Sequence, residues 1–297
     1  MKNSHHLKFV AFIKKNANAP FYIKRQVMRA CTLTALLYSC ETWCTRSIDK
    51  SIRSIYMSCI RSILGVRTST DSDLCLYEMR MPSIEAQILD IQRKYLINVM
   101  NNSTKHPLLC RIMEMGRNVR LRSGHLTRCT AMKHIDKIIE QNDTQCIVND
   151  MKERQNRIAD STKTKTVLYR QWCPDLATHD AYISRKYFPE CWRISWTRFR
   201  LGSTNLPCEK GRWRNDNMTI CLCGENQTEK HILLECEERV VQTTSIHELF
   251  NQQDQRSAMK SIFESLLKFE KVRGSQEGYV QGCYCDGMLV VTGADTR

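Results

Sequence analysis

The sequence predicts a mainly α-helical protein, in which a helical bundle is followed by a smaller helical region with a metal-binding cluster. Apolar residues recur every three or four positions from Ser47 to Leu64 and from Ser83 to about Met100, which is the period of one helix face. Between positions 221 and 236 the spacing C-x-C-x7-H-x4-C supplies a ligand set typical of closed zinc sites. At 297 residues, 42% of them hydrophobic, the chain can bury a core and form two domains.

The first helices are predicted from their apolar faces and their end signals. One helix is expected from about Tyr22 to Tyr38 and a second from Ser47 to Leu64. Ser47 is the expected N-cap of the second helix, Asp49 lies in its first turn, and Gly65 suits its C-terminal end. Met81 to Ser83 then interrupt the pattern, and Ser83 begins a third helix that ends near Met100.

The pattern is weaker beyond residue 100. Turns are indicated at His106–Pro107, Gly116 and Gly124. Helical periodicity returns at Met132–Ile139 and at Ile147–Met151.

The stretch from Asp160 to Thr166, rich in Ser, Thr and Lys, is the predicted domain boundary. We therefore expect domains at 1–160 and 161–274. A disordered tail is expected at 275–297, where Cys283 and Cys285 have no partner pair nearby.

Two amphipathic helices are predicted in the second domain. Trp192, Trp196 and Phe199 are spaced by four and three residues, as on one helix face. The second helix has an apolar face that runs from Met259 to Phe269.

The charge of the chain is strongly positive and unevenly distributed. Its net charge is +14 and its isoelectric point is about 9.2. Residues 1–70 contain 12 Lys and Arg against 2 Asp and Glu, and residues 185–214 contain 8 against 2. Because these two segments account for all of the excess positive charge, a polyanion is the partner to consider first.

The cysteines and the hydropathy indicate the compartment. The 16 cysteines are scattered without a disulfide-framework pattern, which favours a reducing environment. The first residues lack a secretory signal, and no apolar stretch is long enough for a transmembrane helix. We therefore expect an intracellular protein, nuclear or cytoplasmic, without a membrane partner or a small-molecule substrate.

The four candidate ligands are Cys221, Cys223, His231 and Cys236, and they match the Cys3His set of structural zinc sites. Gly224 allows the tight turn that brings the first two thiols to one ion. His231 and Cys236 come from a second element. On an ideal α-helix they would be rotated by about 500°, so the helix must begin near His231 or loosen before Cys236.

Several runs resemble the C-terminal region of non-LTR (LINE-type) retrotransposon reverse transcriptases. RFRLGS at 198–203, CLCG at 221–224 and HILLEC at 231–236 resemble the zinc knuckle and the basic segment before it. LLYSCETW at 36–43, CIRSILGVR at 59–67 and MPSIEAQILDIQRKYL at 81–96 resemble the thumb that follows the catalytic palm. The resemblance covers roughly residues 20–100 and 185–270.

This resemblance implies a thumb and linker at 1–160, a zinc knuckle, and RNA or DNA as the partner. Aromatic rings interleaved with guanidinium groups suit stacking on bases and neutralising phosphates. The same aromatics also suit a buried helix face, and we favour a core role for them. The candidate nucleic-acid contacts are Arg193, Arg198, Arg200, Arg212, Arg214 and Trp196.

No polymerase activity is expected from this chain. Nucleotide addition needs paired carboxylates that hold two metal ions, and the sequence contains no Asp-Asp dipeptide and no recognisable nuclease motif. The resemblance thus implies a truncated, non-catalytic nucleic-acid-binding fragment. The alternative is a zinc-stabilised helical protein-interaction module without a nucleic-acid role.

Overall fold

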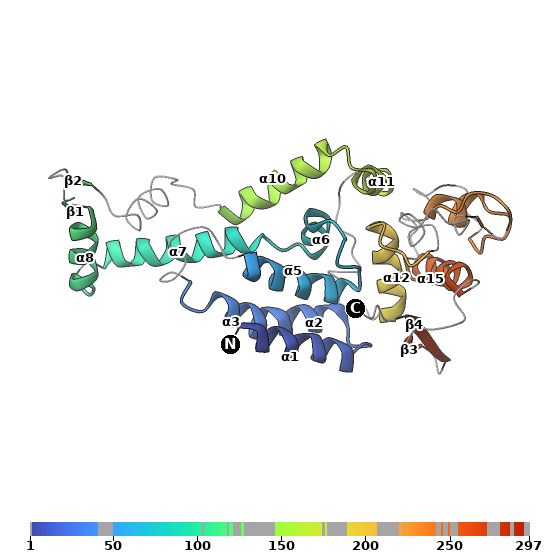
Figure 1. Cartoon of the computed structure of the whole chain (residues 1–297), viewed down its shortest axis with the longest axis horizontal. Coiled ribbons are helices and arrows are strands. Elements are labelled where there is room, and N and C mark those ends of the chain that lie inside the picture. The colour runs from blue at the N-terminus through green and yellow to red at the C-terminus, as the bar shows by residue number, and fades with distance from the viewer. Residues whose placement is uncertain are drawn as a thin grey trace.

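The computed structural model describes most of the chain. The described residues are 2–40, 50–102, 104–117, 119–120, 126–127, 146–173, 176, 189–206, 220–221, 223–241, 245, 249, 255–271, 280–285 and 288–293. The N-terminal helices are α1 (Lys2–Lys15), α2 (Phe21–Val27), η1 (Met28–Leu33), α3 (Thr34–Leu37), α5 (Lys50–Leu64), α6 (Ser72–Met79), α7 (Ile84–Asn101) and α8 (Pro107–Arg117). The later helices are α10 (Cys146–Asp160), α11 (Thr164–Trp172), α12 (Glu190–Arg200), η4 (His231–Glu235) and α15 (Gln255–Lys271). The prediction of a mainly α-helical fold is confirmed (Figure 1).

The predicted helix from Tyr22 to Tyr38 is present as three consecutive elements. The α-helix α2 continues into the π-helical segment η1 and then into α3 without leaving helical backbone angles. In Figure 1 these elements run beside α1, below α5. They form one outer layer of the bundle.

The helices α5 and α7 agree with their predicted bounds. Ser83 caps α7, because its side chain accepts a hydrogen bond from the amide of Ala86. Gly65 ends α5 with φ +72°, and a Cβ built there would lie 2.8 Å from Cγ2 of Ile194. Glycine is needed at this position both for the backbone angle and for the close approach of α12. The predicted N-terminal cap Ser47 and Asp49 lie outside the described residues.

The region after residue 100 differs from its prediction. Pro107 is the first residue of helix α8, where a proline is favoured because its missing amide would have no partner. A short hairpin of β1 (Val119–Arg120) and β2 (Leu126–Thr127) follows. The helix expected at Ile147–Met151 is confirmed within α10. The periodicity at Met132–Ile139 lies outside the described residues.

One cluster of buried apolar side chains connects the two predicted domains. It includes Phe9 in α1, Ile60 in α5, Trp196 in α12 and Phe269 in α15. Helix α10 contacts α6 and α7, and α12 contacts α5 and α15. The predicted boundary at 160/161 therefore does not separate two cores.

The C-terminal tail also differs from its prediction. Strand β3 (Val280–Cys285) pairs with β4 (Met288–Gly293) in an antiparallel hairpin, where the sequence predicted disorder. The amphipathic helix expected at Met259–Phe269 is confirmed as α15. Among the described helices, none combines the length and the apolar composition that crossing a bilayer requires.

Candidate metal centre

The first two candidate ligands lie on a tight turn. The amide of Cys221 donates to the carbonyl of Glu225 at 2.7 Å, and the amide of Gly224 donates to the carbonyl of Cys221 at 3.1 Å. Gly224 has φ +91°, in the left-handed region that glycine adopts without steric cost. The turn therefore brings the Cys221 and Cys223 side chains to the same side, as predicted.

The other two ligands come from the π-helical segment η4. His231 begins this segment, and its amide donates to Oγ1 of Thr228 at 3.0 Å. The amide of Cys236 donates to the carbonyl of His231 at 2.7 Å, which is an i→i+5 bond. Because a π-turn is wider than an α-turn, positions five apart return towards the same side. This is the loosening that the spacing of His231 and Cys236 required.

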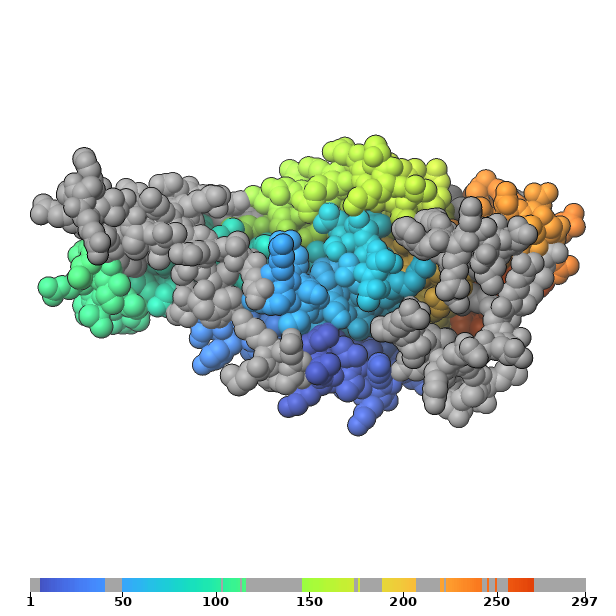
Figure 2. Space-filling view, in the orientation of Figure 1, coloured from blue at the N-terminus to red at the C-terminus, as the bar shows by residue number. Residues whose placement is uncertain are grey.

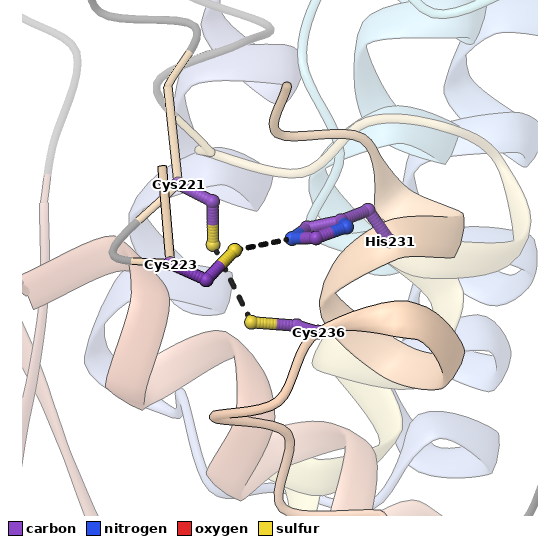
Figure 3. Close-up of side chains that lie close together, drawn as sticks. All are labelled: Cys221, Cys223, His231 and Cys236. Carbon is purple, nitrogen blue, oxygen red and sulfur yellow. Dashed lines mark hydrogen bonds between the residues drawn. The ribbon is translucent and has the colours of Figure 1, made fainter. Parts of the chain in front are cut away.

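The four side chains converge on one point (Figure 3). Sγ of Cys223 lies 3.1 Å from Nε2 of His231, and Sγ of Cys221 lies 3.6 Å from Sγ of Cys236. All four candidate ligand atoms lie within 4.8 Å of one another. A tetrahedral zinc site with bonds of about 2.0–2.3 Å has ligand–ligand edges of about 3.5–3.8 Å. The cluster can therefore hold a metal ion with little rearrangement.

The cluster is largely removed from solvent. Cys221, His231 and Cys236 are buried, and Cys223 is half-buried. Burial, together with the neighbouring Cys221 and Cys223 thiols, raises the pKa of Cys236 to about 12. A coordinated cation has the opposite effect, because a thiol that binds a metal is deprotonated.

Contacts on several sides attach the segment that carries the candidate ligands to the helical core. The buried side chain of Glu229 accepts hydrogen bonds from Nζ of Lys165 at 3.2 Å and from Oγ1 of Thr204 at 3.4 Å. Ile232 and Leu233 are fully buried within the main apolar cluster. Helix α15 contacts η4, and Lys165 of α11 donates to Glu229. Ligation at this site would therefore fix η4 against α15 and link η4 to α11.

The structure buries Arg193, one of the predicted nucleic-acid contacts, inside the core. Its side chain is 2% exposed and donates to Glu190 and to the carbonyl of Ile63. Glu190 also accepts from the buried Nζ of Lys24 at 2.7 Å. Arg193 therefore belongs to an internal ion-pair network that connects α12 to α2 and α5.

Arg200 and Trp196 are also unsuited to the predicted contact. Arg200 is 3% exposed and pairs with the fully buried Glu78, which also accepts a hydrogen bond from the hydroxyl of Tyr169. Trp196 is fully buried, so it cannot stack on a base, whereas the core role favoured for the aromatics is confirmed. The half-buried Arg198 donates through Nε to the carbonyl of Gly65 at 2.7 Å.

The remaining predicted contacts, Arg212 and Arg214, lie outside the described residues. The carboxylates that pair with the α12 arginines are not among the predicted site residues. Glu190 is a near neighbour of Arg193 on the same helix, and an i, i+3 pair is visible in sequence. Glu78 is 122 residues away from Arg200, so no local pattern identifies it.

Most described cysteines are free, and Cys191 in α12 is disulfide-bonded.

Comparison of this chain with protein-family models, with curated proteins and with solved structures finds no match. The interpretation of the site therefore depends on the chemistry and geometry of its own residues.

Proposed function

We propose that this chain is a non-catalytic nucleic-acid-binding protein with a structural zinc centre, similar to the thumb and zinc-knuckle part of a LINE-type reverse transcriptase. The observation that carries the proposal is the separation of charge. The net charge is +14, and the first 40 residues contain seven Lys and Arg and no Asp or Glu. These residues form the layer made by α1, α2, η1 and α3 (Figure 1).

Cations of the N-terminal layer are available to a polyanion. Lys8, Lys14, Lys15 and Arg29 are exposed. Figure 2 shows α1 and its neighbours along the lower edge of the molecule. A surface of one sign of charge attracts the phosphate backbone without requiring a particular base sequence.

Several exposed cations on other elements are paired with carboxylates. Arg53 pairs with Glu85, Lys94 with Asp90, and Lys163 with Asp71. Each of these pairs is a solvated surface contact that leaves little net charge for a partner. This contrast makes the N-terminal layer the best candidate for the polyanion-binding surface.

The proposed zinc ion has a structural role. Cys221, Cys223, His231 and Cys236 would occupy all four tetrahedral positions, which leaves none open for water or substrate. Zinc bound in this way would supply folding free energy to the unit around η4.

One observation favours the alternative function of a protein-interaction module. Leu108, Ile112 and Met115 form an exposed apolar stripe on α8 at helical spacing. A protein-interaction module without a nucleic-acid role would show no phosphate-dependent binding of RNA, so the experiment below separates the two functions.

A neutral-backbone control tests the proposed function. We expect the zinc-loaded protein to bind a labelled single-stranded RNA, measured by fluorescence anisotropy, because its unbalanced cations neutralise phosphates. A peptide nucleic acid of the same base sequence has no phosphates and should bind at least tenfold more weakly, on the order of the loss of one or two phosphate contacts. Equal affinity for the two polymers, or no binding of RNA, would contradict the proposal.

A further inference from the structure

Three arginines from different elements meet where α2 approaches the end of α6. Arg25 lies in α2, Arg29 in η1, and Arg80 is the residue that ends α6. Nη2 of Arg25 donates to the carbonyl of Arg80 at 3.3 Å. Arg29 follows Arg25 by one helical turn, so the two side chains lie on the same side of the helix.

This arginine cluster, defined as Arg25, Arg29 and Arg80, has no balancing carboxylate among the described residues. Across the part of the chain that the structure describes, none of the three forms an ion pair, in contrast to Arg53 or Arg157. Burial, and after it the charges of Arg29 and Arg80, lower the pKa of Arg25. Like charges thus lie close together without compensation.

One donor in the cluster is buried without an acceptor. Nε of Arg25 is removed from solvent and has no hydrogen-bond partner. A buried donor without a partner costs about 1–3 kcal/mol, and more when it is charged. An anion placed between the arginines could accept this bond and balance the charge in the same step.

The backbone of Arg80 is a second unusual feature of the cluster. Arg80 has φ +47° and ψ +49°, and its amide and that of Met81 close the end of α6 by bonding to Tyr77 and Leu76. Glycine is the usual residue at this left-handed position, because a Cβ is unfavourable there. An exposed arginine therefore occupies a position whose backbone angles favour glycine.

We propose that the arginine cluster is a phosphate-binding site that grips the backbone of a bound nucleic acid. Guanidinium groups suit this partner because their donors match the oxygens of phosphate. Arg25 and Arg29 belong to the acid-free N-terminal layer, so phosphates beside the cluster would meet further cations. The inference rests on the proposed function, and it names the residues of that surface that bear most of the contact.

The test uses two substitutions that preserve the fold. Arg80→Gly removes one guanidinium at a backbone angle that glycine adopts freely, and Arg29→Gln removes an exposed one. The matched control is Lys105→Gln with Arg111→Gln, which removes the same charge from exposed positions at and before α8, far from α2 (Figure 1). Thermal melts followed by circular dichroism verify that the wild type, the double variant Arg29→Gln/Arg80→Gly and the control are all folded.

The double variant Arg29→Gln/Arg80→Gly should bind single-stranded RNA about 25-fold more weakly than wild type at 0.1 M salt. Its plot of log affinity against log salt should be shallower by about 1.4, because each phosphate contact on a single strand contributes about 0.7. The control should change much less in both respects. Equal losses in the two variants would show that the arginines act only as general charge, and that result overturns the site.

Inorganic pyrophosphate, titrated by calorimetry, separates failure of the site from failure of the proposed function. If the wild type binds no RNA, but binds pyrophosphate and loses that binding only in Arg29→Gln/Arg80→Gly, the anion site stands and the nucleic-acid function fails. If the double variant and the control bind pyrophosphate equally, the site is overturned.

Discussion

Replacing Glu190 with Ala is expected to lower the free energy of unfolding by about 3–5 kcal/mol. Glu190 is the carboxylate between Lys24 and Arg193, and all three side chains are at most 2% exposed. Its removal leaves two buried cations without their counter-charge. Urea denaturation followed by tryptophan fluorescence measures the change.

An exposed ion pair supplies the control for this prediction. Glu85 pairs with Arg53, whose side chain is 63% exposed. Glu85→Ala should cost only about 0–1 kcal/mol, because a surface pair is screened by water. Similar small losses in Glu85→Ala and Glu190→Ala would mean that the network around α12 does not stabilise the fold.

Replacing Cys223 with Ser is expected to abolish metal binding. We expect the purified wild type to carry about one zinc ion per chain, and structural zinc sites of this kind bind with about 10–16 kcal/mol in small peptides. Cys223 is only half-buried, so its substitution tests ligation more than packing. Metal analysis by mass spectrometry measures the loss, and hydrogen exchange at 228–236 should rise with it.

The control for the metal prediction is Cys110→Ser. Cys110 in α8 is a free cysteine of similar exposure, and it lies outside the metal cluster. This variant should keep its zinc. Full zinc retention in Cys223→Ser would contradict ligation by Cys223 and place the ion elsewhere.

The elements that the sequence predicted best are those with local signals. Helix α5 has an uninterrupted apolar stripe and a terminal glycine, and α7 has a capping serine, so both were located closely. The metal cluster was predicted for the same reason, because its four ligands lie within 16 residues of one another. The five-residue spacing from His231 to Cys236 does not fit one face of an ideal α-helix, so it also indicated a distortion. The structure has this distortion as the π-helical segment η4.

The elements that the sequence could not predict depend on distant contacts. Arg200 and Lys24 pair with carboxylates 122 and 166 residues away, so their buried roles are invisible in any local pattern. The basic helix with interleaved aromatics therefore suggests a binding surface in the sequence, although Arg193 and Arg200 are buried in ion pairs. Helix α8 is not predicted because His106–Pro107 indicates a turn in the sequence, whereas Pro107 is the first residue of the helix.

The salt dependence of RNA binding is the decisive measurement for the proposed binding of nucleic acid by this chain. With the three arginines of the cluster on phosphates, log affinity for single-stranded RNA should fall linearly with log salt, with a slope of about −2 or steeper. Lysines of α1 that also contact the backbone would steepen it further. A slope near zero, or no measurable affinity at low salt for the zinc-loaded protein, would contradict the account of this chain as a nucleic-acid-binding protein.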